Sequence, residues 1–228
     1  MLGQLMRWFS PDGLREAAGR VIPILICITF HELSHGFAAY KLGDRTAKDM
    51  GRLTLNPVRH IDPIGCLMML FTGFGWAKPV PVNMRMFRNP KRGMAITALA
   101  GPVSNLILAV PFLFLYGAAY VFIPPTQLGN FFSGLLIDTA YISVALAVFN
   151  LIPIPPLDGS KVLFSLASDR QYYNLMRYER YGMIILVAVM YIGILDGPIS
   201  SATSFVFNLL AYVARASIFL FSHLAELF

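Results

Sequence analysis

Long apolar runs alternate with short polar stretches along the chain, and this pattern predicts membrane-crossing helices. A helix needs about 20 apolar residues to cross ~30 Å of hydrocarbon. The runs of sufficient length are residues 21–40, 94–123, 131–152 and 199–221. Residues 64–76 and 183–195 form shorter runs, and we expect the first to be re-entrant or interfacial. The pattern predicts an all-α polytopic membrane protein, a helical bundle with a short re-entrant extended or β segment.

The amino end predicts a helix in the membrane interface over residues 1–18. Its apolar face would consist of Leu2, Leu5, Met6, Trp8 and Phe9. Ser10 and Pro11 are typical of an N-cap followed by proline at the first helical position. From Pro11 the helix is expected to continue through Tyr40 as the first crossing.

Two segments between the first and second crossings predict extended backbone. Residues 51–57 alternate in polarity and end in Asn-Pro, which favours a short strand followed by a turn. Residues 77–83 contain Pro79 and Pro81, which favour extended backbone as on an edge strand. Extended backbone at membrane depth must be buried in protein or line a wet cavity. We therefore expect residues 77–83 to border a water-filled pocket.

Composition agrees with a membrane protein and excludes a nucleic-acid partner. The chain is 57% hydrophobic and 13% charged, whereas soluble domains carry about 25% charged residues. The net charge is +6, but the cations lie between apolar runs, where they act as topology signals. Cys27 and Cys66 lie in apolar surroundings and form no C-x-x-C pair, so we expect packed thiols.

Lysine and arginine are distributed unevenly among the links, and this sets the expected orientation. Residues 124–130 contain none and residues 159–180 contain four. Residues 41–92 contain ten: Lys41, Arg45, Lys48, Arg52, Arg59, Lys78, Arg85, Arg88, Lys91 and Arg92. By the positive-inside rule, the links 41–92 and 159–180 are cytoplasmic. We predict a multi-pass protein of the cell membrane.

Residues 31–35, inside the first predicted crossing, read His-Glu-x-x-His. Residues four apart share a helix face, so His31 and His35 can direct their imidazoles at one metal ion. Glu32 lies beside them, where it can accept a proton from water activated by the metal. The alternative is two histidines satisfied by hydrogen bonds within the bundle. Ionisable residues are costly in a membrane, however, so three together favour a catalytic metal site.

A catalytic zinc ion takes three protein ligands and leaves one position for water. The candidates for the third ligand are Asp44, Asp49, Asp62, Asp138, Asp158, His60 and His223. We expect Asp138 to lie toward the outer half of its helix, the three acids of the basic link to be solvated, and both histidines to be interfacial. Asp158 follows three prolines that can unwind the third crossing and direct its carboxylate inward. The residues therefore favour Asp158.

The start of the second crossing contains Gly101-Pro102-Val103-Ser104-Asn105. Its small residues permit close approach between helices, and Asn105 can form a hydrogen bond across such a contact. We expect helix packing to be the main role of Asn105.

Two motifs taken together resemble the site-2 protease family of intramembrane zinc metalloproteases. They are His31-Glu32-x-x-His35 and Asn150-x-x-Pro153-x-Pro155-x-Leu157-Asp158-Gly159. Residues 101–105 and 75–83 also resemble compact bacterial members of that family, and the similarity covers about residues 20–165. The resemblance implies one zinc ion held by His31, His35 and Asp158. It implies Glu32 as general base and Asn150 as a residue that positions substrate or stabilises the oxyanion.

The expected function is therefore hydrolysis of peptide bonds in or near transmembrane segments, as in regulated intramembrane proteolysis. We expect a single domain over residues 1–228, with a catalytic core at 20–165, carboxyl-terminal membrane helices at 181–228, and no PDZ or CBS domain. Its partners would be a transmembrane protein substrate and the lipid bilayer, with the active site toward the cytoplasm. A metal transporter would show an internal repeat, and a catalytically silent scaffold would not need Glu32.

Overall fold

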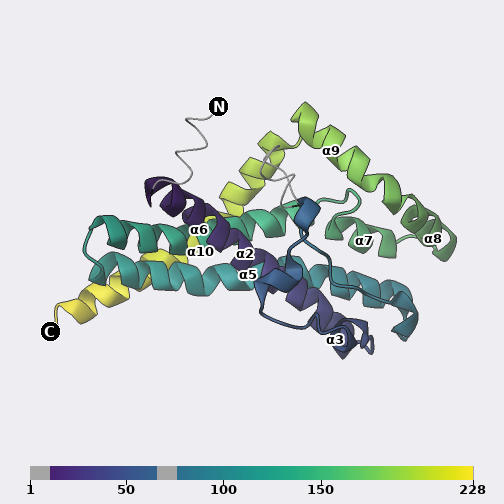
Figure 1. The fold of residues 1–228 in the computed structure, drawn as a ribbon, viewed down its shortest axis with the longest axis horizontal. Coiled ribbons are helices and arrows are strands. Elements are labelled where there is room, and N and C mark those ends of the chain that lie inside the picture. The colour runs from purple at the N-terminus through teal and green to yellow at the C-terminus, as the bar shows by residue number, and fades with distance from the viewer. Residues whose placement is uncertain (1–10, 66–75, 228) are drawn as a thin grey trace.

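Helices account for nearly all the regular structure in the computed structural model, which describes residues 11–65 and 76–227. The α-helices are α2 (Pro11–Lys41), α3 (Thr46–Asp49), α5 (Pro90–Phe122), α6 (Gln127–Asn150), α7 (Asp158–Ser165), α8 (Asp169–Tyr178), α9 (Gly182–Ile192) and α10 (Asp196–Ala225). The 3-10 helices are η1 (Pro57–His60), η2 (Met84–Met86) and η3 (Glu179–Tyr181). In Figure 1, α5 and α6 run along the long axis, whereas α2 and α10 lie obliquely to them.

Four helices in the described part of the chain are long and apolar enough to cross a membrane. They are Gly19–Lys41 within α2, Pro90–Phe122, Gln127–Asn150 and Asp196–Ala225. These helices match the four long apolar runs, so the predicted all-α polytopic membrane protein is confirmed. Most of the predicted interfacial helix at the amino end, and most of the short run 64–76, lie outside the described residues.

The carboxyl end of α2 is defined by Gly43, which has a left-handed φ of 107°. The N–H of Asp44 donates to the Ala39 carbonyl at 2.9 Å, and the N–H of Gly43 donates to the Tyr40 carbonyl at 3.1 Å. This pair of bonds is the Schellman arrangement that ends a helix at glycine. The chain therefore turns sharply after the first crossing and remains close to α2.

Helix α5 is the centre of the bundle and contacts α2, α6, α7 and α10. The core shared by α5, α6 and α10 consists of Ala109, Leu113, Ala140, Val144 and Ala214. Where α5 meets α10, a Cβ added to Gly117 would collide with the Ser217 hydroxyl. Close approach at small residues is how membrane helices gain packing without a hydrophobic difference from lipid.

The link between α2 and α5 is held by buried polar side chains. Asp44 is fully buried, and its carboxylate accepts hydrogen bonds from the N–H groups of Thr46 and Asn83 at 2.9 and 2.6 Å. Arg52 is also buried and donates to the carbonyls of Lys78 and Pro79 at 2.8 and 3.3 Å. The expectation of a solvated Asp44 is therefore wrong. This carboxylate joins the end of α2 to the segment before η2.

Two expectations for this link need correction, and one is met. Residues 51–56 form a turn, a bend and irregular backbone in place of the predicted strand. The Asn56 side chain accepts from the Val58 N–H and starts η1 at Pro57. His60 is 1% exposed, so it is buried where an interfacial position was expected. Residues 78–83 belong to no helix or strand, as expected for the proline-containing segment, and the Lys78 N–H donates to the His60 carbonyl at 2.9 Å. Ala77 forms an isolated antiparallel bridge with Ile61.

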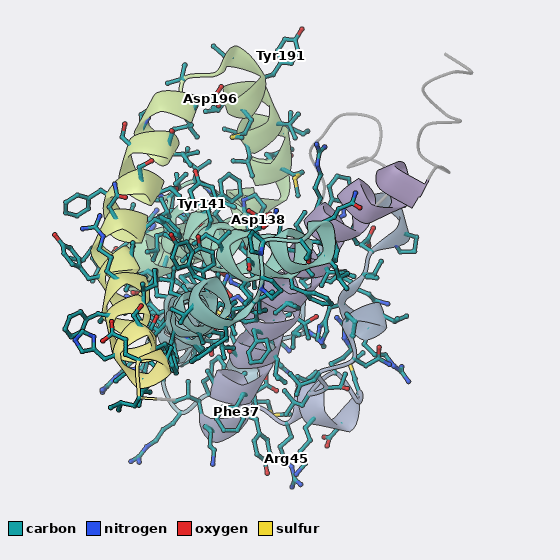
Figure 2. The ribbon with its side chains drawn as sticks, turned by 90° about the vertical axis from the view of Figure 1, so that its left-hand side faces the viewer. Phe37, Arg45, Asp138, Tyr141, Tyr191 and Asp196 are labelled. Atoms are coloured by element: carbon teal, nitrogen blue, oxygen red, sulfur yellow. The ribbon has the colours of Figure 1, made fainter. Side chains whose placement is uncertain are left out.

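The amino end of α10 and the short apolar helix α9 project from the bundle. Figure 2 shows Tyr191 and Asp196 at the far end of this projection. Tyr191 is 93% exposed, and Ile184 and Ile192 are also exposed. Such apolar exposure suits a lipid-facing surface.

Candidate active site

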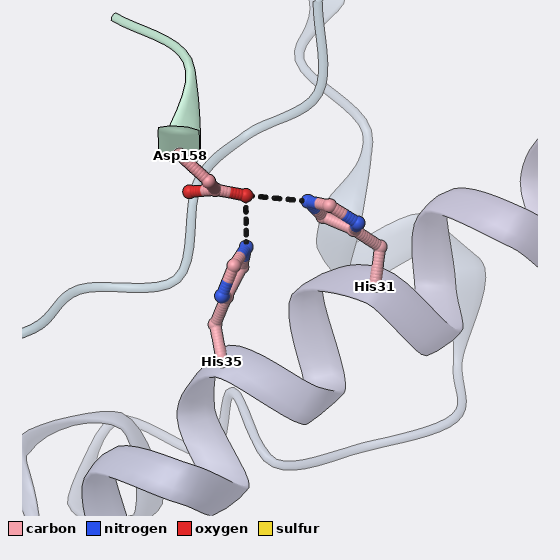
Figure 3. A group of neighbouring side chains, drawn as sticks. All are labelled: His31, His35 and Asp158. Carbon is pink, nitrogen blue, oxygen red and sulfur yellow. Dashed lines mark hydrogen bonds and ion pairs between the residues drawn. The ribbon is translucent and has the colours of Figure 1, made fainter. Parts of the chain in front are cut away.

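Three potential metal ligands that are distant in sequence meet at one point inside the bundle. His31 and His35 lie one turn apart on α2, and Asp158 is the first residue of α7 (Figure 3). The Asp158 Oδ2 atom lies 3.1 Å from the Nε2 atom of each histidine. Their possible ligand atoms all lie within 4.8 Å of one another. The structure thus brings together the three residues from which the sequence predicted a metal site.

The position of Asp158 follows from the chain between α6 and α7. Helix α6 ends at Asn150, and α7 begins eight residues later, after turns that contain Pro153, Pro155 and Pro156. Three prolines remove backbone donors and prevent regular helix. A Cβ added to Gly159 would collide with the carbonyl of Leu151. Glycine therefore permits the tight return that directs the Asp158 carboxylate at α2.

The hydrogen bonding of His35 shows that the site suits a cation. Its Nδ1 atom lies 2.7 Å from the Thr97 carbonyl, which can only accept a hydrogen bond, so Nδ1 carries a proton. In a neutral imidazole the lone pair is then on Nε2, which faces the Asp158 carboxylate. Two electron-rich atoms at 3.1 Å require a positive charge between them. A shared proton or a metal ion meets this requirement.

The electrostatics of Asp158 also suit a divalent cation. Burial raises the pKa of this carboxyl, but hydrogen bonds with His31 and His35 outweigh burial and hold its pKa below the usual range. Asp158 therefore remains ionised at neutral pH. Two imidazoles and one carboxylate form a usual donor set for zinc, whose ligand atoms at ~2.1 Å from the metal lie about 3.4 Å apart in a tetrahedron. The observed 3.1 Å separations are close to that value.

Helix α5 leaves room for both imidazoles at Gly101. A Cβ added there would lie 2.5 Å from His35 and 2.6 Å from His31. One turn further along α5, the fully buried Asn105 places its Nδ2 atom 3.3 Å from the His31 Nδ1 atom. The expected hydrogen bond of Asn105 across a helix contact is therefore present, and its partner is one of the two histidines.

A small cavity of about 160 Å³ adjoins the three ligands. Its lining includes Glu32, Val80, Asn150 and Lys161. The Val80 N–H donates to Glu32 Oε2 at 2.8 Å, so the extended segment contacts the predicted base directly. As predicted, this segment borders a pocket. The Asn150 amide donates to the Leu146 carbonyl at 2.9 Å and retains a second N–H.

The other candidates for the third ligand lie outside the site. Asp138 is exposed on α6, twelve residues before Asn150, which corresponds to roughly 18 Å along a helix. Asp49 is exposed, and the Asp62 side chain accepts from the Gly65 N–H. His223 contacts the Phe219 carbonyl on its own helix. These positions agree with the choice of Asp158 from the sequence.

Sequence reasoning missed several groups that contact the candidate ligands and base. The Val80 N–H and the Thr97 carbonyl belong to the main chain, so no residue type indicates them. Lys161 approaches Asp158 Oδ1 at 3.8 Å, and a lysine three residues after the acid was the available signal. For Gly101 and Asn105 the sequence predicted helix packing as the main role, and residues 101–105 contributed to the family resemblance.

Comparisons with known proteins find relatives that are named as zinc metalloproteases. "Putative zinc metalloprotease YwhC" of Bacillus subtilis is 42% identical over 175 residues, or 74% of this chain and 78% of that protein. "Putative zinc metalloprotease Rip2" of Mycolicibacterium smegmatis is 29% identical over 199 residues, 82% of this chain and 74% of its own length. "Putative zinc metalloprotease MJ0611" of Methanocaldococcus jannaschii is 33% identical over 138 residues, 59% of this chain and 63% of its own length. No solved structure matches the chain.

A family match adds to these similarities. Residues 126–195 match peptidase family M50, and this segment contains Asn150 and Asp158. The resemblance to site-2 proteases is thereby confirmed. With 42% identity to a relative of which it covers 78%, this membrane chain belongs to peptidase family M50, the zinc metalloprotease family of the site-2 proteases.

Proposed function

We propose that the chain is an intramembrane zinc endopeptidase that hydrolyses peptide bonds in or near transmembrane segments of membrane proteins. The observation that carries the proposal is that Asp158 meets His31 and His35 beside Glu32, and that these last three residues lie on a membrane-spanning helix. His31 and His35 precede Lys41 by ten and six residues, or about 15 and 9 Å of helix. A site at that depth suits substrates embedded in the bilayer.

His31, His35 and Asp158 would hold one zinc ion, which when bound activates water and polarises the scissile carbonyl. Glu32 is the general base, accepting a proton from the attacking water and later donating it to the leaving amine. The Val80 N–H occupies Glu32 Oε2 and leaves Oε1 for that exchange. The spare N–H of Asn150 is available to the developing oxyanion or to the substrate backbone.

The extended segment supports a proposal for how substrate is held. A peptide bond in a transmembrane helix is shielded by helical hydrogen bonds, so the substrate must unwind locally. The Val80 carbonyl and the Val82 N–H have no hydrogen-bond partner within residues 11–65 and 76–227. They can pair with an unwound substrate strand by strand addition. Glu32 is part of the lining of the cavity beside them.

Orientation is also part of the proposal. The ten cations of residues 41–92 and the four of residues 159–180 favour a cytoplasmic position for the links beside the site. Figure 1 places α3, α7 and α8 at the same end of the bundle, opposite the carboxyl terminus. We therefore assign cleavage to the cytoplasmic half of the membrane, with transmembrane proteins as the substrate class.

The test combines metal analysis with cleavage of two reporters by wild type and Glu32→Gln. One reporter is a transmembrane helix in lipid vesicles, and the other is an unfolded water-soluble peptide. Wild type is expected to contain one zinc ion per chain and to cleave the membrane reporter. Glu32→Gln is expected to retain zinc and to lose at least 10²-fold in rate, because proton transfer contributes about that much. Equal turnover by both proteins, or cleavage of the soluble peptide alone, would contradict the proposal.

A further inference from the structure

His31 and His35 each have their Nδ1 atom in contact with α5, but the two contacts differ in kind. His35 Nδ1 faces the main-chain carbonyl of Thr97 at 2.7 Å. His31 Nδ1 faces the side-chain amide of Asn105 at 3.3 Å. A carbonyl can only accept, whereas an asparagine amide carries an acceptor at one end and two donors at the other. The protonated nitrogen is therefore defined for His35 and depends on Asn105 for His31.

The observed orientation of Asn105 suits a histidine without metal. Its Nδ2 donates to His31 Nδ1, and the proton of that imidazole is then on Nε2, which faces Asp158 Oδ2 at 3.1 Å. In this arrangement the buried Oδ1 atom of Asn105 has no hydrogen-bond partner in the described part of the chain. Metal binding through Nε2 requires the opposite tautomer, with the proton on Nδ1. A half-turn of the Asn105 amide would then present Oδ1 to that proton.

We propose that Asn105 is a positioning residue for the metal site: its side-chain oxygen accepts the Nδ1 proton of His31 and thereby holds Nε2 as a zinc ligand. This inference rests on the ligand set of the proposed function. Histidines that bind zinc commonly donate their other N–H to such an acceptor, which sets the tautomer and ring orientation.

The backbone around Asn105 is organised for this contact. Gly101, one turn earlier on α5, leaves space for both imidazoles, and a Cβ there would lie 2.6 Å from His31. The Asn105 carbonyl accepts from the Ser143 hydroxyl of α6 at 2.8 Å, which joins α5 to α6 at the same residue. The side chain of Asn105 thus contacts His31 of α2, and its main-chain carbonyl accepts a hydrogen bond from α6. The two functions can be separated by mutation.

The test measures zinc affinity in detergent by competition with a fluorescent chelator, on protein first stripped of metal. Asn105→Leu keeps a side chain branched at Cγ and removes the acceptor, so its zinc dissociation constant should rise about 10–100-fold. Asn105→Asp keeps an oxygen at the same position and should remain within about threefold of wild type. Ser143→Ala is the matched control, because it removes a helix–helix hydrogen bond at Asn105 and leaves the amide intact. It should bind zinc as wild type does.

The outcomes separate this proposal from the proposed function. Wild-type affinity in Asn105→Leu, or equal weakening in the Leu and Asp variants, would overturn the positioning role even if wild type is an active zinc protease. Failure of wild type to bind zinc would overturn the function first. If Asn105→Leu does not fold, ¹⁵N-histidine spectra of the wild-type protein decide. Zinc-loaded protein should carry the His31 proton on Nδ1, and a proton on Nε2 would refute the inference.

Discussion

Asp158 contributes a charge to the candidate metal site that neither histidine can supply. It is 7% exposed, and one of its oxygens faces both imidazoles at 3.1 Å. A buried, ionised carboxylate is costly without a cationic partner. The proposed zinc ion would remove that cost. Lys161 approaches the other oxygen at 3.8 Å, and being partly exposed it compensates only weakly.

Replacement of Asp158 tests its role as a ligand. Asp158→Ala should lower zinc affinity by more than the ~10–100-fold typical of an outer partner, and cleavage should fall below detection. Metal analysis and the membrane reporter measure both effects. Asp138→Asn is the control, because Asp138 lies exposed on α6 outside the site.

An alternative role for Asp158 is to stabilise the start of α7, because it is the first residue of that helix. Asparagine can serve that purpose without a charge. If Asp158→Asn bound zinc and cleaved as well as wild type, the residue would not be a ligand.

At the residue scale, the side chains of the candidate site could be predicted, whereas the groups that form hydrogen bonds with them could not. The spacing of His31 and His35 and the prolines before Asp158 carry chemical meaning in the sequence. The acceptor for His35 is a carbonyl of Thr97, 62 residues away, and every residue has a carbonyl. Asn105 was identifiable, but its contact with His31 depends on how α5 crosses α2. No local pattern encodes that crossing.

The extended segment acts as an element through its main chain. Arg52 holds the carbonyls of Lys78 and Pro79, Asp44 holds the N–H of Asn83, and the Val80 N–H contacts Glu32. The segment is thus fixed by side chains from the preceding link and from α2. Extended backbone was predictable from the prolines, whereas these attachments were not, because they come from residues 26 to 48 positions away.

Removal of the Val80 N–H should impair catalysis without loss of metal. Proline at position 80 suits extended backbone but has no N–H, so Val80→Pro leaves Glu32 without this donor. A hydrogen bond to a charged group contributes about 1.5–3 kcal/mol, which corresponds to a roughly 10–100-fold lower cleavage rate. Zinc content should be unchanged. Val80→Ala keeps the N–H, and if both variants lost the same activity, the side chain of Val80 would be responsible.

The contact between α5 and α10 depends on the absence of a side chain at Gly117. A Cβ there would meet the Ser217 hydroxyl and the Ala214 carbonyl. Gly117→Val should therefore lower stability by about 1–3 kcal/mol through overpacking. The measurement is the thermal midpoint in detergent. Gly134→Val is the matched control, because nothing lies within 4 Å of a Cβ at Gly134. Equal midpoints for the two variants would show that α10 can move away from α5.

For the whole molecule, the distribution of cations predicts sidedness. Arg88→Cys reports on the link 41–92 and Gln127→Cys on the link 124–130, which contains no lysine or arginine. A membrane-impermeant thiol reagent should label position 127 in intact cells and position 88 only after permeabilisation. Cells producing the chain without introduced cysteines give the background from Cys27 and Cys66. Labelling of position 88 from outside would reverse the orientation.

The arrangement of the whole molecule was predictable to the level of its crossings. The lengths of the apolar runs identified four spans, because the thickness of the hydrocarbon layer sets the minimum length of a crossing helix. The central position of α5 was not predictable, because hydropathy gives no information about which helices are neighbours. That position is nevertheless what brings Gly101, Thr97 and Asn105 against both histidines.

The proposed ligands are separated by 127 residues between His31 and Asp158, and this separation has a consequence for biosynthesis. Ribosomes add about 5–20 residues per second, so Asp158 is added to the chain roughly 6–25 seconds after His31. During that interval the nascent protein contains its base and two histidines but lacks the third ligand. With the proposed ligand set, the chain would therefore remain inactive toward other newly inserted membrane segments, and toward itself, until its third crossing and the turn that follows have been synthesised.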